Sequence, residues 1–218
     1  MLHTVSEDPE TKAMFFTQLG ELFSEKAKKI IRNKNKKIAF CRCAGNAFRN
    51  AAEKTEDMKE KITLFLTAAD QFSEAREKTA NFQEKSILSE KAAEIYIEAA
   101  RNENDNERKL ILLTEANSLL AQAAKTKTNN TERKKLNQQI AMICINSAQN
   151  IKTEKDIFVF YPKFNALAAK QYTLLAEEET NASQKSKMYE KAEELYTEAK
   201  KDAEARKCSL QAKFYAGT

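Results

Sequence analysis

Large apolar side chains recur along the chain at a near-constant interval. We take one of them in each repeat as an anchor, and the anchors are Phe23, Phe48, Phe72, Tyr96, Leu120, Cys144, Tyr172 and Tyr196. Successive anchors are 24 or 25 residues apart, except for a step of 28 residues from Cys144 to Tyr172. A period of this length is typical of repeat proteins, so the repeat sets the expected fold.

Each anchor belongs to a stripe of apolar residues with helical spacing. Four positions before the anchor the residue is apolar and usually small, as at Ala44 and Ala68, and eight positions before it is again apolar, as at Leu64. Three positions after the anchor an alanine often recurs, as at Ala51. Spacings of four, four and three place these side chains on one face of a helix. The pattern therefore predicts about eight amphipathic helices of about 20 residues, each roughly 30 Å long.

Polar clusters separate the stripes, for example at 55–57, 78–81 and 180–183, and they consist of residue types that cap helices and turn chains. Such short links make consecutive helices antiparallel. Each helix then needs neighbours on both sides to bury its stripe, as in an α-solenoid. We expect one all-α domain over residues 1–218, with helices centred near residues 23, 48, 72, 96, 120, 144, 172 and 196. The pattern is compatible with an open solenoid and with a closed helical bundle.

One stretch of the repeat resembles known families. The segment Ala44-Gly45-Asn46-Ala47-Phe48, followed by Ala51, resembles the helices of tetratricopeptide repeats (TPR), and residues 37–48 look most like the soluble NSF attachment proteins (SNAP). The resemblance implies a right-handed stack of helical hairpins. The SNAP branch implies an array that clamps a helical bundle of membrane-fusion proteins and recruits a disassembling ATPase. The chain departs from these families in its longer helix pairs, in the missing proline that closes each repeat, and in residues 214–218, which do not match the ATPase-contacting tail.

The side chains that most enzymes need are scarce. His3 is the only histidine, which excludes histidine triads and zinc-protease motifs, and three glycines cannot form a phosphate-binding loop. Cys41 and Cys43 are two positions apart, about 200° around a helix, so they cannot hold one metal together. We expect the four cysteines to be free and largely buried. The sequence therefore predicts no enzyme, no cofactor, no metal site and no small-molecule substrate.

A basic residue stands eleven positions before seven of the eight anchors, at Lys12, Lys37, Lys61, Lys85, Lys109, Arg133 and Lys185. This position falls in the first helical turn, where a cation opposes the helix dipole. One interpretation is that the stems cover the end of the core while the charged groups pair with nearby glutamates. The other is a basic ladder along each edge of the array.

The densest charge lies between the first two expected helices. Seven Lys or Arg and no acidic residue occupy positions 26–37. Cations are stabilised at a helix C-terminus, so the run is compatible with an ordinary solvated link. It is also a candidate surface for an acidic protein, an anionic membrane surface or a nucleic acid. The candidate contact residues here are Lys28, Lys29, Arg32, Lys34, Lys36 and Lys37.

The single long step of the repeat contains the apolar segment 157–162. Pro162 favours a helix start or an extended entry, so we expect a hydrophobic loop before it. The loop either folds back over the core or presents an apolar patch to a partner or membrane. Its candidate contact residues are Phe158, Phe160 and Tyr161.

These patterns favour a non-catalytic, TPR-like adaptor that binds a helical or acidic segment of a protein partner. We expect it to be cytoplasmic, because no signal peptide or membrane-spanning segment is evident. The alternative is a peripheral membrane-surface or nucleic-acid binder that uses the basic segment 26–37. Nucleic acid is the less expected ligand, because the net charge of +5 is modest and no aromatic residues alternate with the cations.

Overall fold

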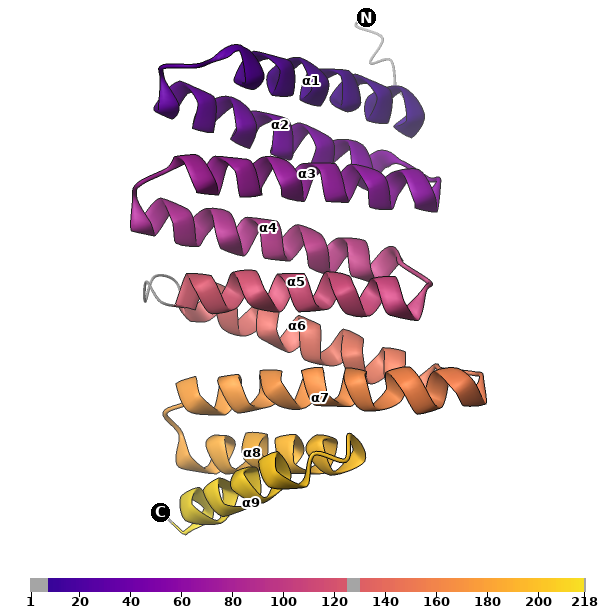
Figure 1. The fold of residues 1–218 in the computed structure, drawn as a ribbon, viewed down its shortest axis with the longest axis vertical. Coiled ribbons are helices and arrows are strands. Elements are labelled where there is room, and N and C mark those ends of the chain that lie inside the picture. The colour runs from indigo at the N-terminus through magenta and orange to yellow at the C-terminus, as the bar shows by residue number, and fades with distance from the viewer. Residues whose placement is uncertain (1–7, 125–129, 218) are drawn as a thin grey trace, which may run out of the picture. The chain divides into compact units, whose positions relative to one another are not determined.

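All regular structure is helical in the computed structural model, which describes residues 8–124 and 130–217. The predicted all-α repeat array is therefore confirmed (Figure 1). The helices of the described residues are α1 (Pro9–Lys29), α2 (Lys34–Lys54), α3 (Met58–Lys78), α4 (Phe82–Asn102), α5 (Asn106–Ala124), α6 (Asn130–Gln149), α7 (Glu154–Glu178), α8 (Ala182–Glu198) and α9 (Asp202–Ala216).

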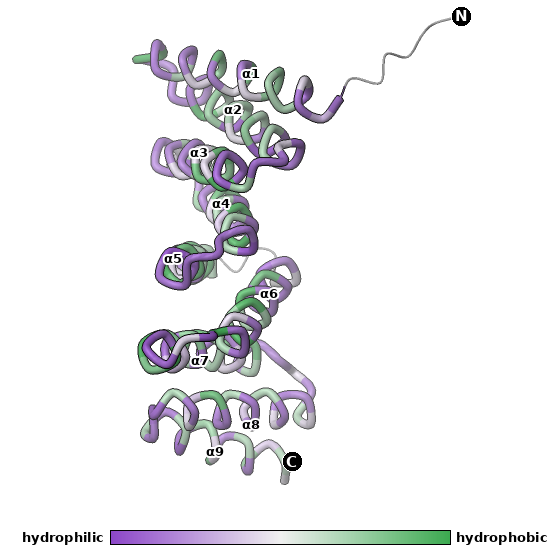
Figure 2. Tube along the Cα trace, turned by 90° about the vertical axis from the view of Figure 1, so that its right-hand side faces the viewer, coloured by the Kyte–Doolittle hydropathy of each residue, from purple (hydrophilic) through white to green (hydrophobic). Residues whose placement is uncertain are grey.

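The chain forms two compact units, and α5 contributes to both. Unit 1 comprises Met1–Asn104 and Ser118–Thr128, and unit 2 comprises Asp105–Asn117 and Asn129–Thr218. Within each unit, links of three or four described residues reverse the chain. Consecutive helices consequently run antiparallel, and hydrophobic positions recur along each of them between hydrophilic ones (Figure 2).

Polar side chains cap the helix starts with the period of the repeat. The residue before α1, α2, α3, α4, α7 and α8 accepts a hydrogen bond from a backbone N–H three positions on. Asn33 Oδ1, for example, accepts from the Lys36 N–H at 2.9 Å. Each cap satisfies one of the N–H groups that a helix start leaves unpaired. The basic position eleven before each anchor is accordingly the fourth residue of its helix, as at Lys37 in α2.

The stripe positions form the core of each unit. In α3, Leu64, Ala68, Phe72 and Ala75 are all buried, and most equivalent positions of the other helices are buried too. Phe15 departs from the expectation, because 58% of its surface is exposed. It lies on α1, which packs on α2 and has no described helix before it.

Close contact between consecutive helices depends on a small residue three positions before the anchor. A Cβ on Gly45 would lie 2.7 Å from the ring of Phe72, and one on Gly20 would lie 2.9 Å from the ring of Phe48. The anchor ring of the following helix thus sits directly on the glycine backbone. The equivalent position in other helices is a buried alanine, as at Ala69, Ala93, Ala141 and Ala169.

Side chains also link some helices to the next but one. In unit 1, Arg76 of α3 donates to Gln122 of α5. In unit 2, Gln171 of α7 donates to Asn117 of α5 at 3.0 Å, and both side chains are buried. These hydrogen bonds connect α3 with α5 in unit 1 and α5 with α7 in unit 2.

The hydrophobic loop predicted before Pro162 is wrong, because the segment is helical. α7 begins at Glu154, is capped by Thr153, and contains Pro162 in its interior. It has 25 residues, against 21 in α2, α3 and α4. Four extra residues turn a helix by about 400°, so they keep the stripe within about 40° of its phase. The insertion is thus an extra helical turn.

The predicted set of about eight helices omitted α9. α8 has only 17 residues and ends at a turn in which Lys200 has a positive φ of 57°. α9 follows, and Ala205, Cys208 and Ala212 face the core beside α8. The repeat could not indicate this helix, because the next anchor after Tyr196 would fall beyond the last residue.

Candidate protein-binding surface

The α1–α2 link carries the basic run at one end of unit 1. α1 ends at Lys29 and α2 begins at Lys34, so the run spans a helix end, a link and a first turn, as predicted. Lys28, Arg32, Lys34 and Lys36 are exposed and form no ion pair with any residue in the described part of the chain. We call these four residues the basic end. Lys28 has a longer-range electrostatic interaction with Glu25, and solvent surrounds the charged groups of all four residues.

The other two candidates of this run are engaged. Lys37 Nζ lies 3.0 Å from Glu74 Oε1 on α3, and only 21% of its side chain is exposed. Lys29 Nζ pairs with Glu25 Oε1 at 2.5 Å, and its ammonium group lowers the pKa of that carboxyl. The Lys29 pair lies on an open helix face and contributes little to stability. Lys37 therefore has a packing role, whereas Lys29 stays accessible.

The three candidate residues of α7 differ in how far their side chains are exposed. Phe158 is 79% exposed, but Phe160 and Tyr161 are half-buried. The Tyr161 hydroxyl donates to Glu198 Oε2 at 2.9 Å, and this hydrogen bond raises the pKa of Tyr161. Asn165 Nδ2 donates to the same oxygen at 2.8 Å. Tyr161 thus joins α7 to the end of α8, and Phe158 is the one widely exposed ring of the three.

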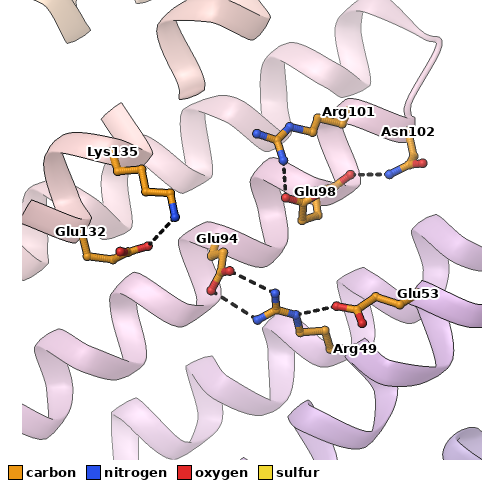
Figure 3. A network of polar contacts seen from close by, with 8 residues as sticks. All are labelled: Arg49, Glu53, Glu94, Glu98, Arg101, Asn102, Glu132 and Lys135. Atoms are coloured by element: carbon orange, nitrogen blue, oxygen red, sulfur yellow. Dashed lines mark hydrogen bonds and ion pairs between the residues drawn. The ribbon is translucent and has the colours of Figure 1, made fainter. Parts of the chain in front are cut away.

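Ion pairs connect α2 to α4 along one face of unit 1. Arg49 donates from Nη1 and Nη2 to the Glu94 carboxylate at 3.3 and 3.0 Å, and from Nε to Glu53 at 3.1 Å (Figure 3). Burial lowers the pKa of the Arg49 guanidinium, but the carboxylates of Glu94 and Glu53 raise it by more, so the pKa is raised overall. A bidentate arrangement of this kind fixes the side chain.

Arg42 lies seven residues before Arg49, on the same face of α2. Its Nη1 makes a single contact with Glu84 Oε1 at 3.4 Å, and 47% of its side chain is exposed. Beside it is a groove of about 450 Å³ between α2 and the start of α4. The groove is lined by Asn35, Ile38, Ala39, Arg42, Thr79, Ala80, Asn81 and Glu84. This site is not among the candidates predicted from the sequence, although the seven-residue spacing of the two arginines indicates a shared face of α2.

Residues 8–124 and 130–217 contain no group of three or more His, Cys, Asp or Glu side chains that could hold a metal ion, and His3 lies outside them. All four cysteines are free thiols; Cys41, Cys144 and Cys208 are buried, as predicted, while Cys43 is exposed. Burial raises the pKa of the Cys41 thiol to about 11. None of the described helices is both long and apolar enough to cross a bilayer.

Comparison with known proteins finds similarity to solved structures. The sequence matches no protein-family model and no curated protein. Among solved structures it is similar to a de novo designed helical repeat protein, DHR64, with a TM-score of 0.44 and 16% identity over 97% of this chain and 100% of that one. It is also similar to the DHF58 filament, with a TM-score of 0.37 and 13% identity over 96% of this chain and 94% of that one. Neither likeness bears on what this chain binds.

Proposed function

We propose that the chain is a non-catalytic helical-repeat adaptor that binds a protein partner through the basic end of unit 1. The observation that carries this proposal is the set of four exposed cations without ion-pair partners among the described residues. Packing occupies most of the apolar stripe positions, so these side chains are not available for recognition. Cations held at a helix end are suited to an acidic segment, because their charge steers association and their backbone is already ordered.

The resemblance of Ala44 to Ala51 to TPR and SNAP helices suggests a narrower role. A TPR-like adaptor in the cytoplasm would present its helical faces to a partner segment, and a SNAP-like one would hold a helical bundle of membrane-fusion proteins. Phe158, which is exposed on α7, is a second contact candidate.

Crosslinking mass spectrometry on the full chain in cell lysate tests the adaptor role. We expect lysine crosslinks to one protein partner to concentrate at Lys28, Lys34 and Lys36. Lys59 and Lys187 are exposed lysines elsewhere on the chain and serve as controls. Crosslinks spread evenly over the basic end and the controls would contradict the proposal.

The second candidate function is a peripheral membrane-surface or nucleic-acid binder. It is favoured by the absence of any acidic residue in positions 26–37. Binding to phosphates weakens steeply with salt, because counterions must be released. Flotation with phosphatidylserine vesicles and filter binding with an oligonucleotide, each at two salt concentrations, separate this function from the adaptor.

A further inference from the structure

We infer that the groove beside Arg42 receives an acidic side chain of the protein partner, whose carboxylate replaces Glu84 on the Arg42 guanidinium. This inference rests on the proposed function and adds the chemistry of one contact. The partner supplies Asp or Glu to the groove and further acidic residues to the basic end.

Arg42 is the available arginine of the α2–α4 face. Arg49 is held by three hydrogen bonds to two carboxylates, and 33% of its side chain is exposed. Arg42 has one contact at 3.4 Å, longer than a good charge-assisted hydrogen bond, and is 47% exposed. An incoming carboxylate can therefore improve the hydrogen bonding of Arg42 but not that of Arg49.

The Glu84 carboxylate keeps its hydrogen bond with Thr79 when Arg42 leaves it. Its Oε2 accepts from the Thr79 hydroxyl at 2.6 Å, and Thr79 is buried. The carboxylate would therefore not be left buried without a hydrogen bond, which is the usual penalty for breaking such a pair. Replacing Glu84 by a partner carboxylate on Arg42 therefore costs little free energy at Glu84.

The walls of the groove favour an anion that can enter a recess. They include the first turns of α2 and α4, whose N-termini carry partial positive charge. Lys34 and Lys36 flank Asn35 in the chain and are exposed. Ala39 and Ala80 leave room for a side chain. A flat bilayer cannot enter such a recess, and no aromatic residue lines it to stack a base.

Fluorescence anisotropy with the full chain and a labelled peptide of alternating Glu and Ala tests the inference. We expect Arg42→Gln to weaken binding about tenfold, since it removes a charged hydrogen-bond donor from the contact. Arg49→Gln is the matched control. It should change affinity less than about twofold, because Arg49 of the unmodified chain is already paired with Glu94 and Glu53 and does not bind the peptide. Glu84→Gln should strengthen binding, because it frees Arg42 while Gln can still accept from Thr79. Circular dichroism melts confirm that each variant folds.

Three results would overturn the inference. They are an absence of peptide binding, an Arg42→Gln affinity equal to that of the unmodified chain, and an equal loss in Arg49→Gln. Tighter binding of oligothymidylate or of phosphatidylserine vesicles with the same dependence on Arg42 would assign the groove to phosphate and also overturn it. Peptide binding that does not depend on Arg42 leaves the adaptor role intact, whereas crosslinks that avoid the basic end reject the adaptor role itself.

Discussion

In the α1–α2 hairpin the backbone follows the repeat without interruption, whereas in α7–α9 it departs from the repeat in three places. The hairpin has capped helices of 21 residues and tight glycine contacts, and four exposed cations without an ion pair lie at its link. The α7–α9 segment contains an extra turn, an interior proline and a positive φ at Lys200. Two of its three candidate contact residues are half-buried, and Tyr161 is hydrogen-bonded to Glu198. We infer that the irregular backbone of α7–α9 has a local energetic cost, whereas the unpaired charge on the regular α1–α2 hairpin has no such cost and fits the proposed contact with a partner.

Pro162→Ala should have the largest effect on stability, because it should make the backbone of α7 regular. Pro162 has no N–H to donate to the Phe158 carbonyl, and alanine restores that bond. We expect the free energy of unfolding to rise by about 2 kcal/mol, somewhat less than the usual cost of an interior proline. Pro9 at the first turn of α1 is the control, since its N–H would be unpaired anyway, and Pro9→Ala should change stability by less than about 0.5 kcal/mol. Urea denaturation measures both, and an unchanged or lower stability for Pro162→Ala would show that the proline costs α7 nothing.

Gly45→Ala changes the regular α1–α2 hairpin and should lower the free energy of unfolding, whereas Pro162→Ala should raise it. The added Cβ would lie 2.7 Å from the buried ring of Phe72. We expect a net loss of about 1 to 2 kcal/mol, because overpacking outweighs the better helix propensity of alanine. At Gly217 the nearest atoms would be 3.9 Å away, so Gly217→Ala is the control and should be nearly neutral. Equal melting temperatures for the two variants would mean that the α2–α3 contact is looser than the structure indicates.

Lys200→Gly should relieve the second irregularity of α7–α9. A left-handed φ of 57° disfavours a side chain but not glycine. We expect a gain of up to about 1 kcal/mol, as at other helix ends closed by glycine. Lys201 has a φ of −106°, so Lys201→Gly should bring no gain and serves as the control. Thermal melts in which both variants lose stability would contradict this view of the turn.

The smallest expected effect is on the stability of the basic end. Replacing Lys28, Arg32, Lys34 and Lys36 together by Gln should change the free energy of unfolding by less than about 0.5 kcal/mol, since exposed, unpaired side chains hold little of the fold together. Losing Lys28 near a helix C-terminus and Lys34 at a helix N-terminus should have opposite effects through the dipole. A loss of several kcal/mol in chemical denaturation would assign these residues a structural role.

The sequence predicted the regular part of this molecule better than its irregular part. The stripe around Phe72 follows from a 3.6-residue period, so the helices and most of their buried residues could be placed. The recurrence of small residues at the position of Gly45 is visible in the sequence. Its role becomes clear only from the structure, where the Phe72 ring of the next helix packs on it. The loop predicted before Pro162 was wrong, because local propensity favoured a loop whereas one extra helical turn keeps the apolar stripe in phase. Arg42 could not be singled out, since its availability depends on its single contact with Glu84 of α4, whose carboxylate also accepts from Thr79.

The most direct test of the account is the affinity of the Glu-Ala peptide for the variant with Gln at Lys28, Arg32, Lys34 and Lys36. The control variant carries Gln at Lys59, Lys155, Lys187 and Lys207, which are also exposed, so both variants lose the same net charge. The account predicts that the basic-end variant loses at least about tenfold in affinity while the control loses much less, because local rather than net charge holds the partner. Equal losses in the two variants would contradict it.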